Sequence, residues 1–209
     1  MKAGNHLLEL INEILDLSRI EAGRVKLDME DVDPHEVLED CVAYISPLAK
    51  RRGVSLSASI PPLGLMSIHT DRMRFRQVLL NLLSNAVKYN VDDGSVVVSV
   101  HEDVPGYVRF CVTDTGPGIA ADKQEEIFEP FSRLGAESTD IEGTSIGLTI
   151  SRKLTLLMAG HLGFESQLGH GSKFWIDLPC AALKAPPVQE SRTDTHLPQL
   201  PDGLHTVLY

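Results

Sequence analysis

Apolar residues recur at helical spacing near the start of the chain. Over residues 5–22 they form a heptad-like stripe, which predicts an amphipathic helix; its members are Leu7, Leu8, Ile11, Ile14 and Leu15. Leu10, Leu17 and Ile20 widen this stripe, so the helix needs apolar partners on more than one side. Those partners belong either to the chain's own domain or to another helix of a bundle. Gly23 is placed to end the helix.

Later stretches alternate between the character of strands and that of helices. The predicted strands are 25–32, 54–60, 66–69, 94–102, 107–113, 162–166 and 173–178. The predicted helices are 34–52, 71–89, 122–128 and 146–158. Asp33 caps the first of these helices, Pro34 takes its first position, and Pro47 predicts a kink or an early end. Asp122 and Glu125 resemble a capping box at the start of the short third helix.

This order of elements predicts the fold class. We expect an α/β protein, a two-layer α/β sandwich in which a mixed sheet is backed by helices, preceded by a long amphipathic helix. Residues 1–23 form that helix, and residues 24–180 form the sandwich domain. Residues 181–204 are rich in Pro, Gln, Asp and Thr and are predicted to be a linker. Residues 205–209 are apolar and β-prone.

Charge and cysteine content narrow the function classes. The 209 residues carry a formal net charge of −10, which argues against a nucleic-acid-binding protein. The 3 cysteines are widely spaced and fit neither a disulfide framework nor a zinc site, so a reducing cytoplasm is the simplest location. No apolar run approaches the length of a membrane span and no signal peptide is evident. We therefore expect no membrane contact by these residues, whereas a membrane anchor elsewhere in a parent protein stays open.

The stretch that is most informative about function follows the predicted strand 107–113. It reads Asp-Thr-Gly-Pro-Gly-Ile, from Asp114 to Ile119. A carboxylate at a strand end can accept a hydrogen bond from an exocyclic amine, and Gly116 and Gly118 leave room for a flat ring beside it. Taken alone, these residues fit an ordinary tight turn equally well.

The helix before this stretch carries a polar ridge. Asn81, Asn85 and Lys88 recur at i, i+4 and i+7 beside an apolar stripe. Asparagine is a mediocre helix former, whereas amide oxygens can ligate Mg²⁺ and lysine binds phosphate. The ridge predicts either a metal and phosphate site or a solvated helix face.

A third polar element lies at residues 142–151, where a glycine-containing turn opens a helix. Free N–H groups and the helix dipole make such a helix start an anion site. A plain loop-to-helix junction is the alternative interpretation.

In this order the three elements resemble the ATP-binding domain of sensor histidine kinases, a family in the superfamily of gyrase, heat-shock protein 90 and mismatch-repair ATPases. The matching boxes are the N box at 81–88 with Tyr89, the G1 box at 114–118, the F box at 128–131 and the G2 box at 143–147. Residues 71–77 resemble the family's run into the N-box helix, and residues 169–179 resemble its closing strand.

The resemblance extends to the ends of the chain. Residues 16–23 resemble the end of the second helix of the family's dimerisation and phosphotransfer bundle, which would make residues 1–23 a partial bundle domain. Residues 24–180 would be the ATP-binding catalytic domain. Residues 205–209 resemble the first strand of a response-regulator receiver domain, as in a hybrid kinase.

The resemblance implies the catalytic part of a two-component sensor histidine kinase. Such a protein binds ATP and Mg²⁺, transfers the γ-phosphate to a histidine on the first bundle helix, and passes it to an aspartate of a response regulator. The implied partners are a response regulator or a fused receiver domain, and a second copy of the chain that forms a homodimer through the N-terminal helix.

The same resemblance implies roles for individual residues. Asp114 would accept a hydrogen bond from the adenine amino group, with Gly118 near the ring and Tyr89 flanking the base. Asn85 would ligate Mg²⁺ and Lys88 would neutralise phosphate charge. The implied catalytic positions are Asn81, Lys88 and Arg133. The implied nucleotide-binding positions are Asn81, Asn85, Lys88, Tyr89, Asp114, Gly116, Gly118, Ile119, Phe131, Gly143, Thr144, Ser145, Ile146, Gly147 and Leu148.

Two departures from the family pattern limit this transfer of roles. Ser145 stands where the family has a glycine, and its side chain could crowd the phosphates or donate a hydrogen bond to them. None of the 8 histidines lies in a His-Glu-x-x-x-Pro element, so the acceptor histidine is absent from the sequence. We expect the chain to begin just after the first bundle helix.

Two other functions stay open. An ATP-hydrolysing conformational switch of the gyrase type would need a glutamate general base where Asn81 stands, and an amide cannot take a proton from water. A degenerate, scaffold-like kinase that no longer binds nucleotide is the second alternative, and Ser145 is its only indication.

Overall fold

The computed structural model describes residues 2–62, 64, 66–130 and 146–181 of the chain. Its helices are α1 (Lys2–Glu21), α2 (Pro34–Arg51), α3 (Arg72–Lys88) and α4 (Gly147–Leu157), with a short 3-10 helix η1 (Ala121–Lys123). Its strands are β1 (Glu30–Val32), β2 (Ser55–Ser59), β3 (Ile68–Thr70), β4 (Ser95–His101), β5 (Tyr107–Asp114), β6 (His161–Gln167) and β7 (Gly171–Pro179).

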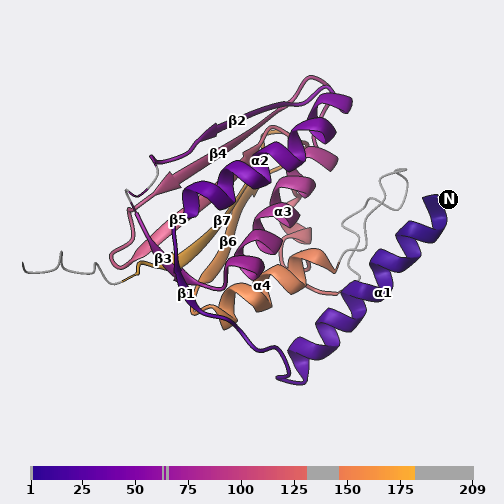
Figure 1. Cartoon of the computed structure of the whole chain (residues 1–209). Helices are drawn as coiled ribbons and strands as arrows, with labels where there is room; N and C mark the ends of the chain where they lie inside the picture. Colours follow the sequence, from indigo (N-terminus) through magenta and orange to yellow (C-terminus); the bar gives the residue numbers. More distant parts are fainter. Residues whose placement is uncertain (1, 63, 65, 131–145, 182–209) are drawn as a thin grey trace, which may run out of the picture.

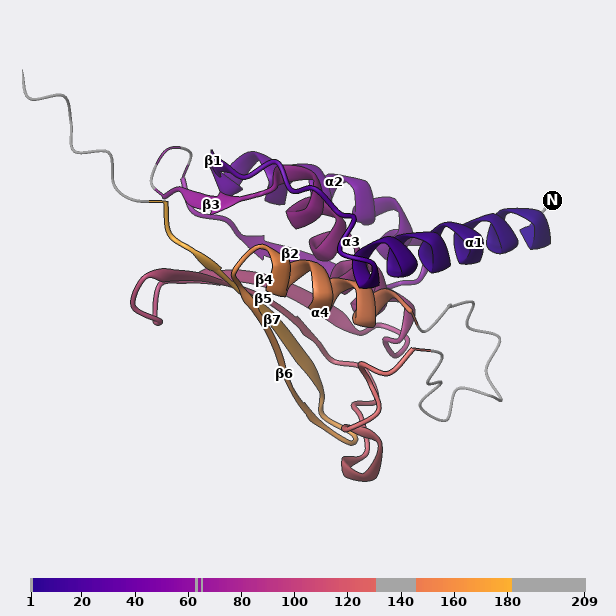
Figure 2. The ribbon, with the colours of Figure 1, turned by 90° about the horizontal axis from the view of Figure 1, so that it is seen from below.

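The main sheet has five strands in the order β2-β4-β5-β7-β6. The β2–β4 pair is parallel and the other pairs are antiparallel, so the sheet is mixed. Helices α2, α3 and α4 lie on one face of this sheet (Figure 1), and the side view shows them as a single layer above it (Figure 2). A separate antiparallel pair, β1–β3, lies at one end. The predicted two-layer α/β sandwich is confirmed.

The core lies between the sheet and the helix layer. Val108, Phe110 and Val112 alternate along β5, are 0–1% exposed and face the helices. The ring of Phe75 from α3 packs on Phe110 with 4.9 Å between the ring centroids. This contact fixes α3 over the central strand of the sheet, and so fixes where the polar ridge of α3 lies.

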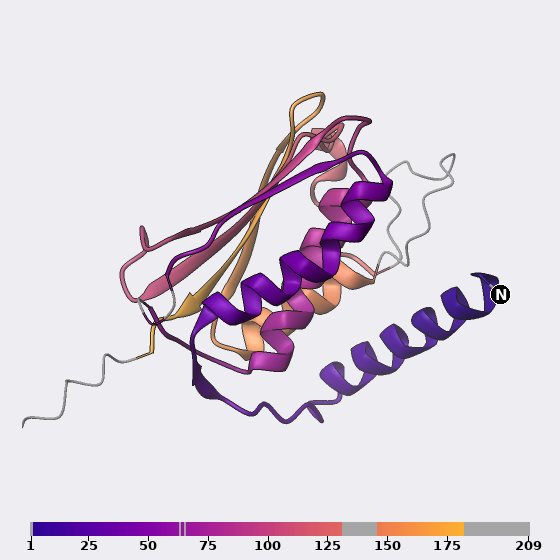
Figure 3. The same cartoon turned by 45° about the horizontal axis from the view of Figure 1, so that its top comes forward.

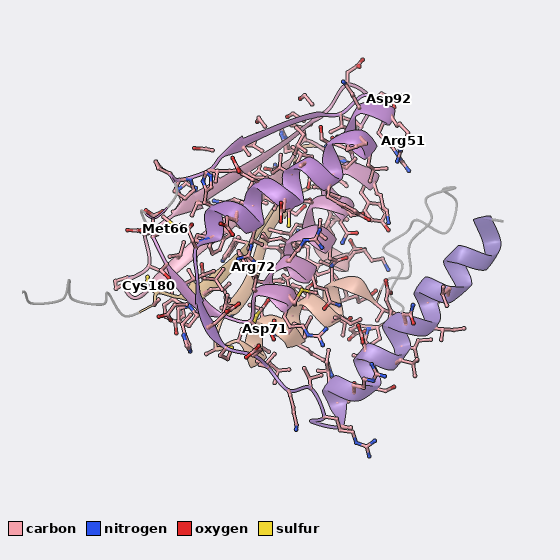
Figure 4. The ribbon with its side chains drawn as sticks, in the orientation of Figure 1. Arg51, Met66, Asp71, Arg72, Asp92 and Cys180 are labelled. Carbon is pink, nitrogen blue, oxygen red and sulfur yellow. The ribbon has the colours of Figure 1, made fainter. Side chains whose placement is uncertain are left out.

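Carboxylate caps start two of the helices in this layer. Asp33 accepts a hydrogen bond from the backbone N–H of His35 at the start of α2, and Asp71 accepts one from that of Arg74 at the start of α3. Asp71 lies at one end of the helix layer and Asp92, beyond the end of α3, at the other (Figure 4). The expectation that Pro47 would end its helix early is wrong, because α2 continues four residues beyond it, to Arg51.

Two predicted elements differ from the structure. Only Glu30–Val32 of the predicted strand 25–32 forms a strand, since its partner β3 offers just three residues for pairing. Residues 122–128 do not form an α-helix; they contain the end of the 3-10 helix and a series of turns, without a side-chain cap. Other contacts replace the expected helix, among them two hydrogen bonds that Gln124 donates to backbone carbonyls, one of Ile119 in the loop after β5 and one of Ser166 in β6.

Helix α1 lies beside the sandwich, beyond α4 (Figure 3). It ends as predicted at Gly23, which has φ +64°, and the N–H of Arg24 donates to the carbonyl of Arg19 at 2.9 Å. Leu17 is its buried contact, and the ammonium of Lys153 in α4 lies 2.9 Å from the carboxylate of Glu21. Four apolar side chains of its stripe are exposed: Leu8, Ile11, Ile14 and Leu15.

Several predictions fall on segments that the structure does not describe. The linker 181–204 is described only at Ala181, whose N–H donates to the carbonyl of Ser67, and residues 205–209 lie outside the described residues. Residues 129–145, a polar and irregular stretch that the sequence indicates to be a lid over the nucleotide, are described only at their first two positions. No helix in the described part of the chain is long and apolar enough to cross a membrane.

We expect Phe75→Ala to destabilise the protein by about 3–5 kcal/mol, because it removes a fully buried ring and leaves a cavity between α3 and β5. Met73→Ala on the same helix is the matched control. Its side chain is 72% exposed, so its free energy of unfolding should change by no more than about 0.5 kcal/mol. Urea denaturation of the two variants measures the difference. Equal losses would mean that Phe75 does not carry the contact between the layers.

Candidate functional site

Asp114 ends β5 on the face of the sheet that the helices cover. Its Oδ1 accepts hydrogen bonds from the N–H of Gly116 at 2.8 Å and from the N–H of Ser172 at 3.3 Å. Burial raises the pKa of Asp114 above its ordinary value, and these two backbone hydrogen bonds oppose the rise. Among the described residues no donor engages Oδ2, so the carboxylate is held by one oxygen and can accept a ligand's donor at the other.

The two glycines after Asp114 allow backbone atoms from other parts of the chain to approach closely. A Cβ on Gly116 would lie 2.7 Å from the carbonyl oxygen of Tyr89, so this loop passes directly under the C-terminal end of α3. Gly118 has φ +68°, and a Cβ there would collide with the carbonyl of Gln167 in β6. Sequence reasoning assigned this space to a ligand ring, whereas in the structure these close approaches are to α3 and to the β6–β7 hairpin.

A polar network below α3 fixes the same loop, and the sequence analysis missed it. Asn90 donates through Nδ2 to the carbonyls of Ala86 and Ser95, at 3.1 and 3.0 Å. The hydroxyl of Thr115 lies 3.3 Å from the Oδ1 of Asn90 and accepts from the N–H of Ser95 at 2.8 Å. The network ties the end of α3, the start of β4 and the loop after Asp114 together. Asn90 directly follows the N box, which is the signal that could have identified it.

The polar ridge of α3 meets the start of α4. Asn81 donates through Nδ2 to the hydroxyl of Ser151 at 2.9 Å, and a Cβ on Gly147 would collide with the amide of Asn81. The side chains of Asn85 and Lys88 are half-buried, and no described residue hydrogen-bonds to either of them. The structure therefore brings Asn81 and Gly147 together and leaves the other two polar groups available to a ligand.

Among the described residues no side chain caps the start of α4. Ile146 takes the N-cap position, is fully buried and makes no capping hydrogen bond through its side chain. The first N–H groups of a helix, here those of Gly147 and Leu148, have no partner within the helix. They lie next to Asn81, so an anion there would meet both helix N–H groups and the polar ridge.

Three half-buried phenylalanines form an apolar surface beside Asp114. Phe164 of β6 stacks on Phe174 of β7, and Phe128 meets Phe164 edge-on; both centroid distances are 5.7 Å. The guanidinium of Arg152 lies 4.9 Å from the centre of the Phe128 ring. Phe174 is two residues beyond Ser172, the cross-strand partner of Asp114, so these rings share the face of the carboxylate. Phe128 lies in the F box, whose predicted nucleotide-binding residue is Phe131, and no sequence signal marked the other two rings.

The remaining predicted positions divide in two. Ile119 and Tyr89 lie within the described site: the N–H of Ile119 donates to Ser166, and Tyr89 follows the last residue of α3 and is 37% exposed. The other predicted residues lie outside the described part of the chain: Phe131, Arg133, Gly143, Thr144 and Ser145.

Comparison with known proteins identifies the family. The family model of histidine kinase-, DNA gyrase B-, and HSP90-like ATPases matches residues 70–182. Histidine protein kinase DivJ of Caulobacter vibrioides is 34% identical over 192 residues, which are 92% of this chain and 32% of that protein. Sensor histidine kinase RcsC of Escherichia coli is 36% identical over 181 residues, 86% of this chain and 19% of that protein.

Solved structures agree with this match. Full-length ShkA in complex with AMPPNP has a TM-score of 0.77 and 35% identity, over 88% of this chain and 38% of that one. The mycobacterial sensor histidine kinase MprB has a TM-score of 0.61 and 26% identity, over 73% of this chain and 97% of that one. The chain belongs to the family of histidine kinase-, DNA gyrase B-, and HSP90-like ATPases, and it spans about a third or less of the length of DivJ and RcsC.

We expect Asp114→Asn to weaken adenosine binding by about 2 kcal/mol or more, because a charge-assisted hydrogen bond becomes a neutral one. The fold should persist, since the amide oxygen can still accept from the N–H groups of Gly116 and Ser172. Calorimetric titration and thermal unfolding measure the two effects. Adenosine affinity equal to that of the unsubstituted chain, in a folded variant, would rule out the assignment.

The raised pKa of Asp114 also predicts two pH effects. Adenosine binding should weaken as pH falls through this pKa, because the protonated carboxyl loses its negative charge. The free protein should lose stability as pH rises through the same range, because the folded state holds this proton more tightly than the unfolded state. Asp114→Asn should remove both effects, which adenosine titrations and thermal unfolding across this pH range would detect.

Proposed function

We propose that this chain binds ATP with Mg²⁺ and is the catalytic part of a two-component sensor histidine kinase. The observation that carries the proposal is the convergence of three elements on α3. The loop after Asp114 passes under its C-terminal end, Gly147 of α4 contacts Asn81, and Asn85 and Lys88 lie on the same ridge. Family membership and relatives named as histidine kinases support the same function.

The residues present fit an adenine nucleotide. The free oxygen of Asp114 suits the amino group of adenine, and the neighbouring phenylalanine rings offer an apolar surface. The N–H groups of Gly147 and Leu148 and the ammonium of Lys88 suit the phosphates. We assign Tyr89 to the flank of the base. Arg133 and the 143–145 segment complete the assignment as proposals from the sequence.

The residues also fit Mg²⁺ at Asn85. This amide is half-buried, and no described residue hydrogen-bonds to it, which leaves its oxygen free as a neutral hard donor. Bound there, Mg²⁺ would neutralise charge on the transferred phosphoryl group. Asn81 would support this side of the site, held in place by Ser151. The protein's own part in such a transfer is positioning and charge stabilisation.

The two alternative functions are less favoured. Asn81 has an amide where a gyrase-type switch needs a general base, and the named relatives DivJ and RcsC are kinases. A scaffold-like kinase without nucleotide binding would not need a buried, half-satisfied carboxylate, an uncapped helix start and an unengaged asparagine side by side.

The proposed partners follow from the same assignment. Helix α1 exposes Leu8, Ile11, Ile14 and Leu15, and such a stripe suits the same helix of a second copy in a homodimeric bundle. The phosphoryl group would pass to a response regulator or a fused receiver domain. We place the reaction in the cytoplasm, where ATP is abundant and free cysteines such as Cys41 and Cys111 stay reduced.

We expect Asn85→Ala to abolish the Mg²⁺ dependence of ATP binding and to leave adenosine binding unchanged, because adenosine has no phosphates to share a metal with. Titration of both ligands with and without Mg²⁺ tests the proposed function. ATP binding that ignores Mg²⁺ in the unsubstituted chain, or unequal adenosine affinity in the variant, would contradict the role of Asn85.

We expect no histidine of this chain to become phosphorylated when it is incubated with ATP and Mg²⁺. Phosphoryl transfer needs an imidazole held in line with the γ-phosphate, and none of the 8 histidines lies in the acceptor motif. Labelled ATP followed by acid treatment measures this directly, and steady ATP hydrolysis in the same samples should stay low. Stoichiometric acid-labile label on any histidine would show that an acceptor lies within this chain, and rapid sustained hydrolysis would favour the gyrase-type switch over the proposed function.

A further inference from the structure

The β6–β7 hairpin contacts the loop after Asp114 at several points. The N–H of Gly169, in the hairpin turn, donates to the carbonyl of Pro117 at 2.7 Å. Gly118 lies so close to the carbonyl of Gln167 that no side chain fits between them. The adenine-side loop therefore rests on the hairpin as well as on α3.

Ser166 is the side chain at the centre of this contact. Its hydroxyl accepts a hydrogen bond from the N–H of Ile119 at 2.8 Å. It also lies 3.1 Å from the carbonyl of Gly171 and 2.9 Å from the hydroxyl of Ser172. Ser166 and Ser172 are cross-strand partners, and Ser172 is in turn the partner of Asp114, so the three side chains form one row across β6, β7 and β5.

Gln124 closes the contact from the other side. Its Nε2 donates to the carbonyl of Ile119 and to the carbonyl of Ser166, each at 3.0 Å. Ile119 is therefore held through both of its backbone polar groups, one by Ser166 and the other by Gln124. A single amide bridges the loop and the strand, which a side chain without two N–H groups cannot do.

We propose that Ser166 and Gln124 are positioning residues for the base of the nucleotide, because they clamp the loop after Asp114 onto the β6–β7 hairpin. This inference rests on the proposed function. The clamp fixes Gly116 and Ser172 relative to each other, and these two residues hold Oδ1 of Asp114. The clamp thereby sets where the other carboxylate oxygen meets a donor on the base. A base with a carbonyl in place of that amino group would bring its own acceptor oxygen against the carboxylate oxygen. With no proton between these two acceptors, such a base would be rejected.

The test compares the binding of adenosine, inosine and ATP by the intact chain and its variants. Ser166→Ala should weaken adenosine binding about fivefold, the loss expected when one hydrogen bond to the loop disappears. The preference for adenosine over inosine should fall by a similar factor, because Asp114 is no longer fixed. The ratio of ATP to adenosine affinity should not change, because the phosphate side is untouched.

Four further variants separate positioning from a structural effect. Gln124→Leu should act in the same direction, and the double variant should lose less than the product of the two single losses, because both residues serve one clamp. Ser166→Thr keeps a hydroxyl and should restore the preference. Ser99→Ala is the matched control, because its hydroxyl contacts His101 on β4 and Cys111 on β5, neither of which belongs to the clamp.

Unchanged adenosine affinity and preference in folded Ser166→Ala and Gln124→Leu would overturn the clamp and leave the proposed function standing. A lower thermal stability with an unchanged adenosine-to-inosine preference would also overturn it, because the residues would then be structural only. Failure of the unsubstituted chain to bind either adenosine or ATP would overturn the proposed function and the clamp together.

Discussion

The close packing of glycine backbone against α3 is the constraint on which the site depends. At Gly116 there is room for the carbonyl of Tyr89 but for no side chain, and at Gly147 there is room only for the amide of Asn81. These two contacts bring the loop after Asp114 and the start of α4 onto one helix. A larger residue at Gly116 would have to push two elements apart, because protein interiors are close-packed, and one at Gly147 would displace the amide of Asn81. The site is therefore a consequence of how tightly three elements meet.

Between these elements, the buried Asp114 carboxylate lowers the stability of the free protein but is well placed to bind a ligand. Burial raises its pKa, so ionisation of the free protein at neutral pH is unfavourable relative to an exposed aspartate. Two backbone N–H groups at Oδ1 offset part of that effect and orient the carboxylate. A ligand donor at the second oxygen would offset more of it. A buried carboxylate with a raised pKa and one free oxygen is typical of a ligand-binding site rather than of a purely structural position.

Local sequence signals predicted the parts of the fold that are decided locally. The cap at Asp33, the end of α1 at Gly23 and the ridge of α3 all follow from short-range patterns. The helix predicted at 122–128 failed because a capping-box pattern carries no information about the carbonyls that Gln124 reaches in the folded chain.

The candidate site was predictable to a similar extent. The positions along α3 and in the loop after Asp114 could be named, since each lies in a short motif of characteristic composition. The row of Asp114, Ser172 and Ser166 could not be found in this way, because it depends on the register between three strands that are far apart in the sequence. The stacked pair Phe164 and Phe174 was missed for the same reason.

One side of helix α1 contacts its own domain, and the other side is exposed to solvent. The two sides differ in how much apolar surface they bury. Its described contacts with the sandwich include the buried Leu17, the partly buried Leu10 and Ile20, the Lys153–Glu21 ion pair, and a long hydrogen bond of 3.5 Å from Gln77 to Asp16. A buried leucine contributes about 2 kcal/mol and an exposed ion pair about 0–1 kcal/mol. The open side presents four large apolar side chains that gain nothing until they are covered. The position of α1 against the sandwich is therefore less strongly fixed than the core beneath α3, and a partner that covers the exposed part of its apolar stripe would stabilise it further.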